Sequence, residues 1–130
     1  SMDYEVSYRH HEDYIHAMVT GENTPETVVQ YMQDVQNECE RRDCYRVLIE
    51  EKLAGPRLGV IEIFDLVATG SRSAAGVFAA LAYVDTNTET PDMTEFAETV
   101  AVNRGIPAAV FSSVDEARNW LNRIKTSKSR

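Results

Sequence analysis

The segment spanning residues 104–121 constrains the fold of this chain most, because it joins a helix end, a short strand and a capped helix. Gly105 fits the position just past a helix, where a left-handed backbone is common, and a proline soon follows. The apolar run 108–111 is too short for a helix, which predicts a strand buried on both faces. Ser113 and Glu116 are spaced as a capping box at the start of the next helix. The segment therefore predicts one half of a βαβ-type unit.

The rest of the chain alternates between strand and helix patterns. Apolar and polar residues alternate over 4–9 and 14–19, on either side of the polar run 10–13, which predicts an antiparallel hairpin. Helix patterns follow at 25–42, 58–69 and 93–104, and further buried strands at 45–49 and 77–84. This order predicts an α/β fold with a single mostly parallel sheet of about five strands and about four helices. The N-terminal hairpin adds an antiparallel strand at one edge of the sheet.

The segment 58–69 suits two structures. Val60 and Phe64 are spaced as on one helical face, whereas Val60 with Ile61 could continue a strand. We favour a helix because Gly70 would end it, and because a crossover between parallel strands requires one.

Charge and composition limit the partners of the chain. Its 130 residues carry 13 basic and 21 acidic side chains, a net charge of -8, so a nucleic acid or an anionic membrane is a poor partner. No apolar run approaches the ~18 residues of a membrane span, and no signal-peptide pattern is present, so we expect a cytoplasmic protein. We expect one domain over residues 2–125 and a disordered basic tail over 126–130. Ser1 before Met2 is typical of a tag remnant.

Two motifs point to a known family. The motif over residues 110–121 and the strand from Leu81 to Asp85, taken with the element order, resemble the SpoIIAA-like branch of the STAS superfamily. The resemblance implies a sheet of about five strands, and a non-enzymatic regulator that binds a partner kinase and is switched by serine phosphorylation. That serine lies in the loop entering the second helix, but the matching residues 54–61 contain no Ser or Thr, so we expect no switch of that type. The fold also resembles CRAL-TRIO-type lipid-binding domains, which implies an apolar ligand cavity.

Polar residues gather at the ends of the predicted strands, where open parallel sheets hold their ligands. The candidate ligand-binding residues are Glu51, Arg57, Asp85, Asn87 and Ser112. Their carboxylate, guanidinium, amide and hydroxyl groups could together orient a polar ligand. The alternative is that these residues are solvated loop ends and helix caps, because turns carry such residues whatever the activity.

No catalytic or metal-binding constellation is complete in the sequence. His10 and His11 are neighbours on an extended strand, so their side chains point to opposite faces and cannot easily bind one ion. His16 is the histidine that we expect to be partly buried. Cys39 lies on the apolar face of its helix, and its spacing to Cys44 matches no zinc or thioredoxin pattern. We therefore predict no catalytic residue, no metal and no cofactor.

Three functions remain open. The leading hypothesis is a non-enzymatic STAS-like module that binds a protein partner or forms a homodimer. The second is a binding protein for a small apolar or lipid-like ligand, held between the sheet and the helices that carry Phe64 and Phe96. The third is a small hydrolase that uses an acidic rim of Glu51 and Asp85, for which the separation of the carboxylates would be decisive.

Overall fold

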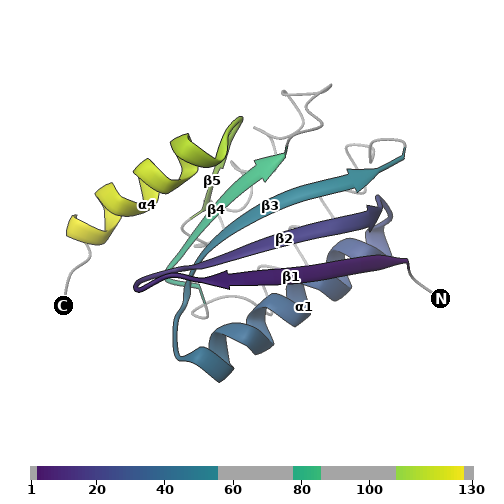
Figure 1. The fold of residues 1–130 in the computed structure, drawn as a ribbon, viewed down its shortest axis with the longest axis horizontal. Helices are drawn as coiled ribbons and strands as arrows, with labels where there is room; N and C mark the ends of the chain where they lie inside the picture. Colours follow the sequence, from purple (N-terminus) through teal and green to yellow (C-terminus); the bar gives the residue numbers. More distant parts are fainter. Residues whose placement is uncertain (1–2, 56–77, 86–107, 128–130) are drawn as a thin grey trace.

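The computed structural model describes residues 3–55, 78–85 and 108–127, which form an α/β fold around one five-stranded mixed sheet (Figure 1). The strands β1 (Tyr4–His10), β2 (Ile15–Glu22), β3 (Arg46–Ala54), β4 (Ala80–Asp85) and β5 (Ala108–Phe111) follow one another across the sheet in chain order. β1 pairs with β2 antiparallel, and the other three pairs are parallel. The predicted α/β class and the antiparallel N-terminal hairpin are thus confirmed. The helices predicted over 58–69 and 93–104 lie outside the described residues.

Helix α1 (Pro25–Arg42) covers one face of the sheet, alongside β1 and β2 (Figure 1). It begins as its sequence predicts, because Thr24 Oγ1 accepts a hydrogen bond of 3.1 Å from the backbone N–H of Thr27. It ends at Asp43, which adopts a left-handed conformation with a φ of 52°. The side chains that α1 buries completely against the sheet include Tyr31, Val35 and Cys39.

Helix α4 (Val114–Ser127) covers the opposite face, over β3, β4 and β5 (Figure 1). Ser113 Oγ accepts a hydrogen bond of 3.2 Å from the backbone N–H of Glu116, as the capping pattern predicts. The Glu116 carboxylate accepts from the Ser112 hydroxyl at 3.0 Å, so it secures the residue before the cap. The side chains that α4 packs against the sheet include Ala117, Leu121 and Trp120, whose ring centroid lies 5.6 Å from that of Phe111.

Strand β3 is longer than its sequence predicts, because it continues past Ile49 to Ala54. Within this extension Glu51 and Leu53 are buried while Lys52 is exposed, so the alternation of a strand persists. β2 provides parallel partners along the whole extension. Glu50 and Glu51, which follow the predicted strand 45–49, therefore lie within β3, with one side chain on each face.

Candidate functional site

The structure brings together two of the predicted ligand-binding residues, Glu51 and Asp85. They are register partners on the neighbouring parallel strands β3 and β4, close to the carboxyl end of β4. Both residues are buried, with exposed fractions of 5% for Glu51 and 2% for Asp85. The two acidic residues predicted to form a rim are therefore part of the protein interior.

Two tyrosines surround these carboxylates on the sheet face that α1 covers. The Tyr31 hydroxyl, from α1, donates a hydrogen bond to Glu51 Oε2, and the Tyr83 side chain, from β4, interacts with both Glu51 and Tyr31. Burial raises the pKa of both phenols well above its usual value, and the neighbouring charge of Glu51 raises it further. Both phenols therefore stay protonated and can donate at neutral pH. We call Tyr31, Glu51, Tyr83 and Asp85 the tyrosine-carboxylate cluster.

The cluster acts chemically as an internal hydrogen-bond network. Glu51 accepts a hydrogen bond from the Tyr31 phenol of α1 and interacts with the Tyr83 phenol of β4, so it has polar partners inside the protein. Such a network ties α1 to β3 and β4 and satisfies a buried carboxylate, which would be costly without partners. This arrangement resembles a structural network more than a rim that presents carboxylates to a substrate.

The remaining predicted site residues have other surroundings. Ser112 is exposed just after β5, where its hydroxyl donates to Glu116 at the start of α4. It therefore serves the cap of a helix, which is the alternative that the sequence left open. Arg57 and Asn87 lie outside the described residues.

Sequence reasoning missed both tyrosines of the cluster. Tyr31 precedes Val35 by one helical turn and therefore reads as an ordinary core residue, and Tyr83 lies inside an apolar strand pattern. The usable signal is that a buried tyrosine hydroxyl needs a hydrogen-bond partner. An acidic residue on a strand facing the helix, such as Glu51, is a suitable acceptor.

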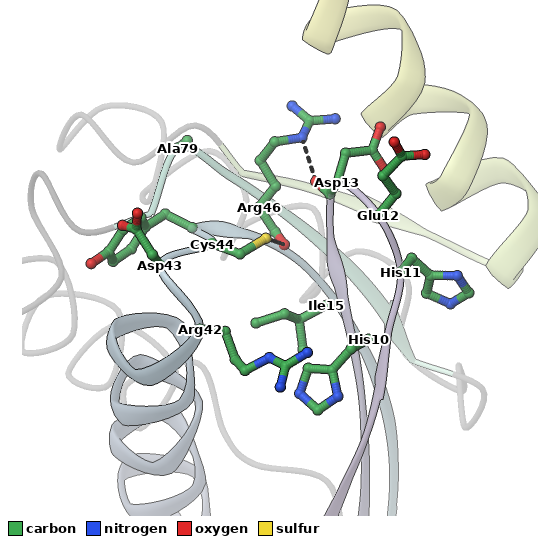
Figure 2. A pocket seen from close by; sticks show the side chains of 11 residues that line it. His10, His11, Glu12, Asp13, Ile15, Arg42, Asp43, Cys44, Arg46 and Ala79 are labelled. Carbon is green, nitrogen blue, oxygen red and sulfur yellow. Dashed lines mark hydrogen bonds between the residues drawn. The ribbon is translucent and has the colours of Figure 1, made fainter.

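A second polar feature is a pocket of about 450 Å³ beside the amino ends of β3 and β4 (Figure 2). It lies between the turn that joins β1 to β2, the end of α1 and the start of β3. Side chains of both charge signs line it, among them His10, Glu12, Asp13, Arg42, Asp43 and Arg46. No sequence pattern predicted this pocket, because its walls come from three separate segments.

Arg46 holds the walls of this pocket together. Its Nε donates to the backbone carbonyl of Asp13 at 3.1 Å, as the dashed line in Figure 2 shows, and another guanidinium nitrogen donates to the carbonyl of Leu121 at 2.5 Å. One side chain thus links the hairpin turn, β3 and α4. The guanidinium is therefore engaged within the protein.

The histidines near the pocket diverge, as predicted. His10 Nε2 lies 2.6 Å from Glu38 Oε2 on α1, whereas the His11 ring stacks on Tyr14 with centroids 4.4 Å apart. Burial raises the pKa of Glu38, but hydrogen bonds from His10 and Arg41 outweigh this effect and leave the pKa lowered. Within residues 3–55, 78–85 and 108–127, no group of His, Cys, Asp or Glu is arranged to hold a metal ion.

His16 is buried, as its position opposite an apolar strand face suggested. It is 7% exposed, and its Nε2 lies 2.9 Å from Glu50 Oε1 on β3. Burial lowers the pKa of His16 and outweighs the opposing effect of the Glu50 carboxylate. The imidazole therefore stays neutral at a lower pH than an exposed histidine would.

Comparison with known proteins gives no match to a family profile and no significantly similar curated protein.

Neither α1 nor α4, the helices in the described part of the chain, is long and apolar enough to cross a membrane.

Proposed function

We propose that this protein is a non-enzymatic, STAS-like interaction module that binds a protein partner or a second copy of itself. The observation that carries the proposal is the open edge of β1. In the described sheet this seven-residue strand lies at the end of the strand order and pairs only with β2. A strand in that position presents unpaired backbone N–H and C=O groups, which are a template for another chain.

The tyrosine-carboxylate cluster supports the non-enzymatic part of the proposal. Glu51 and Asp85 were the strongest acidic candidates for catalysis in the sequence, and both are buried. Glu51 accepts a hydrogen bond from Tyr31 and interacts with the neighbouring Tyr83 phenol. A general base must instead reach a proton of its substrate.

The STAS-like part of the proposal depends on the sequence resemblance. The segments that carry it form β4, β5 and α4, which is the element type that the resemblance implies for each. Helices over 58–69 and 93–104 would complete the four-helix arrangement of a mostly parallel STAS sheet. Because residues 54–61 contain no Ser or Thr, we propose that binding does not depend on phosphorylation in that loop.

The alternative, a binding protein for an apolar or lipid-like ligand, has less support. The pocket between the hairpin turn and the end of α1 is lined largely by charged and polar side chains, which suit a polar ligand better. Phe64 and Phe96, which would line an apolar cavity, lie outside the described residues.

Native mass spectrometry and sedimentation velocity of the full chain would test the proposal, with a pull-down from the source organism beside them. We expect a homodimer or a complex of defined stoichiometry with one protein. A strictly monomeric chain that captures no stoichiometric partner would refute the interaction role. Added mass from a lipid-like molecule would favour the alternative.

A further inference from the structure

The backbone groups that β1 leaves open can be assigned from two hydrogen bonds that flank the hairpin. The carbonyl of Asp3 accepts from the N–H of Glu22 at 3.0 Å, and the N–H of His11 donates to the carbonyl of Tyr14 at 3.0 Å. In an antiparallel pair, bonding toward the neighbouring strand alternates with residue number. The odd-numbered residues of β1 therefore bond to β2. The even-numbered ones, Tyr4, Val6, Tyr8 and His10, direct their N–H and C=O groups away from the sheet.

This edge lacks several features that commonly block strand addition. β1 contains no proline or glycine, and it pairs with β2 one residue to one residue from Tyr4 to His10, without a bulge. Helix α1 contacts the face of β1 through side chains, with the Tyr4 hydroxyl donating to Asp34 and His10 bonding to Glu38. The outward backbone groups are not part of these contacts.

From this edge we infer that a second copy of the chain pairs with β1 in antiparallel fashion, about a two-fold axis at Ser7, and extends the sheet across both molecules. The inference deepens the proposed function and rests on it. Glu5 and Arg9 lie at equal distances on either side of Ser7, and all three are exposed on the face opposite α1. The two-fold axis therefore sets Glu5 of each copy opposite Arg9 of the other, so that two ion pairs form.

The hydrogen-bond pattern requires the same register. A two-fold axis at Ser7 sets Tyr4 opposite His10 and Val6 opposite Tyr8, so the residues with outward backbone groups face one another along the whole strand. Each such pair exchanges two hydrogen bonds, which makes about eight across the interface. Glu5 and Arg9 then fall at non-hydrogen-bonded positions, where Cα atoms approach to about 4.5 Å and side chains meet most closely. Charge, strand overlap and backbone geometry thus agree on one register.

The rest of the fold accommodates this pairing. The two-fold axis is perpendicular to the sheet, so α1 of each copy lies on the same face. Because α1 lies over β1 and β2, the two helix axes are separated by about two strand spacings, roughly 10 Å, which is an ordinary helix packing distance. On that face Val6 of each copy packs beside Tyr8 of the other, a favourable cross-strand pair. An interface along one strand is small, so we expect a dimer with a micromolar dissociation constant.

Charge exchange at the two positions tests the inference. In Glu5→Arg the pairs become arginine against arginine, and in Arg9→Glu they become glutamate against glutamate. Each variant alone should dimerise about tenfold more weakly or worse, measured by sedimentation velocity of the full chain. An equimolar mixture of the two variants restores both ion pairs in a heterodimer and should regain wild-type affinity. The double variant Glu5→Arg/Arg9→Glu restores both ion pairs in a homodimer and should also regain wild-type affinity. It keeps the test valid if one single variant does not fold.

The matched control is Arg123→Glu on the exposed surface of α4, which changes the net charge as Arg9→Glu does and should dimerise like the wild type. A wild-type chain that stays monomeric up to about 1 mM would overturn the inference. The proposed interaction role would then survive only if another protein binds. A dimer that the exchanges leave unchanged, or a mixture that fails to regain affinity, would overturn the β1 interface while leaving self-association intact.

Discussion

Replacing Tyr31 by phenylalanine tests whether the tyrosine-carboxylate cluster contributes to stability. The change removes the hydroxyl that donates to Glu51 and leaves the ring, so the fully buried packing of α1 stays nearly the same. A hydrogen bond to a charged group contributes about 1.5–3 kcal/mol, and in the variant Glu51 still has the Tyr83 phenol as a polar neighbour. We therefore expect Tyr31→Phe to lower the free energy of unfolding by about 2 kcal/mol.

The assay is urea unfolding followed by circular dichroism, with the thermal midpoint as a second measure. A loss of about 2 kcal/mol corresponds to a fall of roughly 8 °C in a domain of this size. Tyr45→Phe is the matched control, because Tyr45 is half-buried just before β3 and its hydroxyl makes no hydrogen bond among the described residues. The control should cost less than about 0.5 kcal/mol.

A double-mutant cycle with Glu51→Gln assigns the effect to the pair. If the bond between Tyr31 and Glu51 is responsible, the two changes should be non-additive by about 1 kcal/mol or more. A Tyr31→Phe variant as stable as Tyr45→Phe, or two strictly additive effects, would refute the role that we give to the cluster.

Three further perturbations probe other parts of the structure. Gly21→Ala should lower the free energy of unfolding by more than about 2 kcal/mol. The reason is that Gly21 has a φ of 135° and that an added Cβ would lie 2.3 Å from the carbonyl oxygen of Asp3. An unchanged urea midpoint would contradict this prediction. Arg46→Ala should lower the free energy of unfolding by about 2 kcal/mol, because two backbone carbonyls lose their hydrogen-bond donor. Arg46→Lys should not restore this stability. Full recovery with lysine would mean that the positive charge alone matters. Burial raises the pKa of the Cys39 thiol to about 12, so in the native protein a thiol reagent should modify the half-buried Cys44 well before Cys39. The pKa of the thiol is about 9.0 in the unfolded chain and about 12 in the folded protein. The contribution of the buried neutral thiol to stability is therefore complete below pH 9.0 and is lost as the pH rises toward about 12. Cys39→Ala should therefore reduce the alkaline decline of the urea midpoint, and an identical decline in both proteins would argue against a buried neutral thiol.

The sequence predicted those elements best whose formation depends only on residues close together in the chain. The hairpin alternation and the helix starts at Thr24 and Ser113 depend on neighbouring residues, and the structure has each of them as predicted. The length of β3 was mispredicted because Glu51 was expected at the end of the strand and not within it. Its burial depends on Tyr31, a helical residue distant along the chain, and no periodicity within β3 contains that information.

The candidate site was likewise predictable only in part. The rule that ligands gather at the carboxyl ends of parallel strands correctly placed Glu51 beside Asp85. It did not predict that a helix would cover them, because the orientation of α1 depends on packing against two strands at once. The pocket beside Arg46 was missed for a related reason, since its walls come from segments that meet only in the folded chain.

The order of the strands has a consequence for how the protein is made. Strands that follow one another in the chain are neighbours throughout the described sheet, and none is inserted between two earlier ones. The hairpin, α1 and β3 can therefore assemble while the C-terminal residues are still being synthesised. Until β4 arrives, β3 has an open edge of its own next to buried apolar residues such as Ile49. That temporary edge, rather than β1 in the finished fold, is where a nascent chain would be most exposed to mispairing.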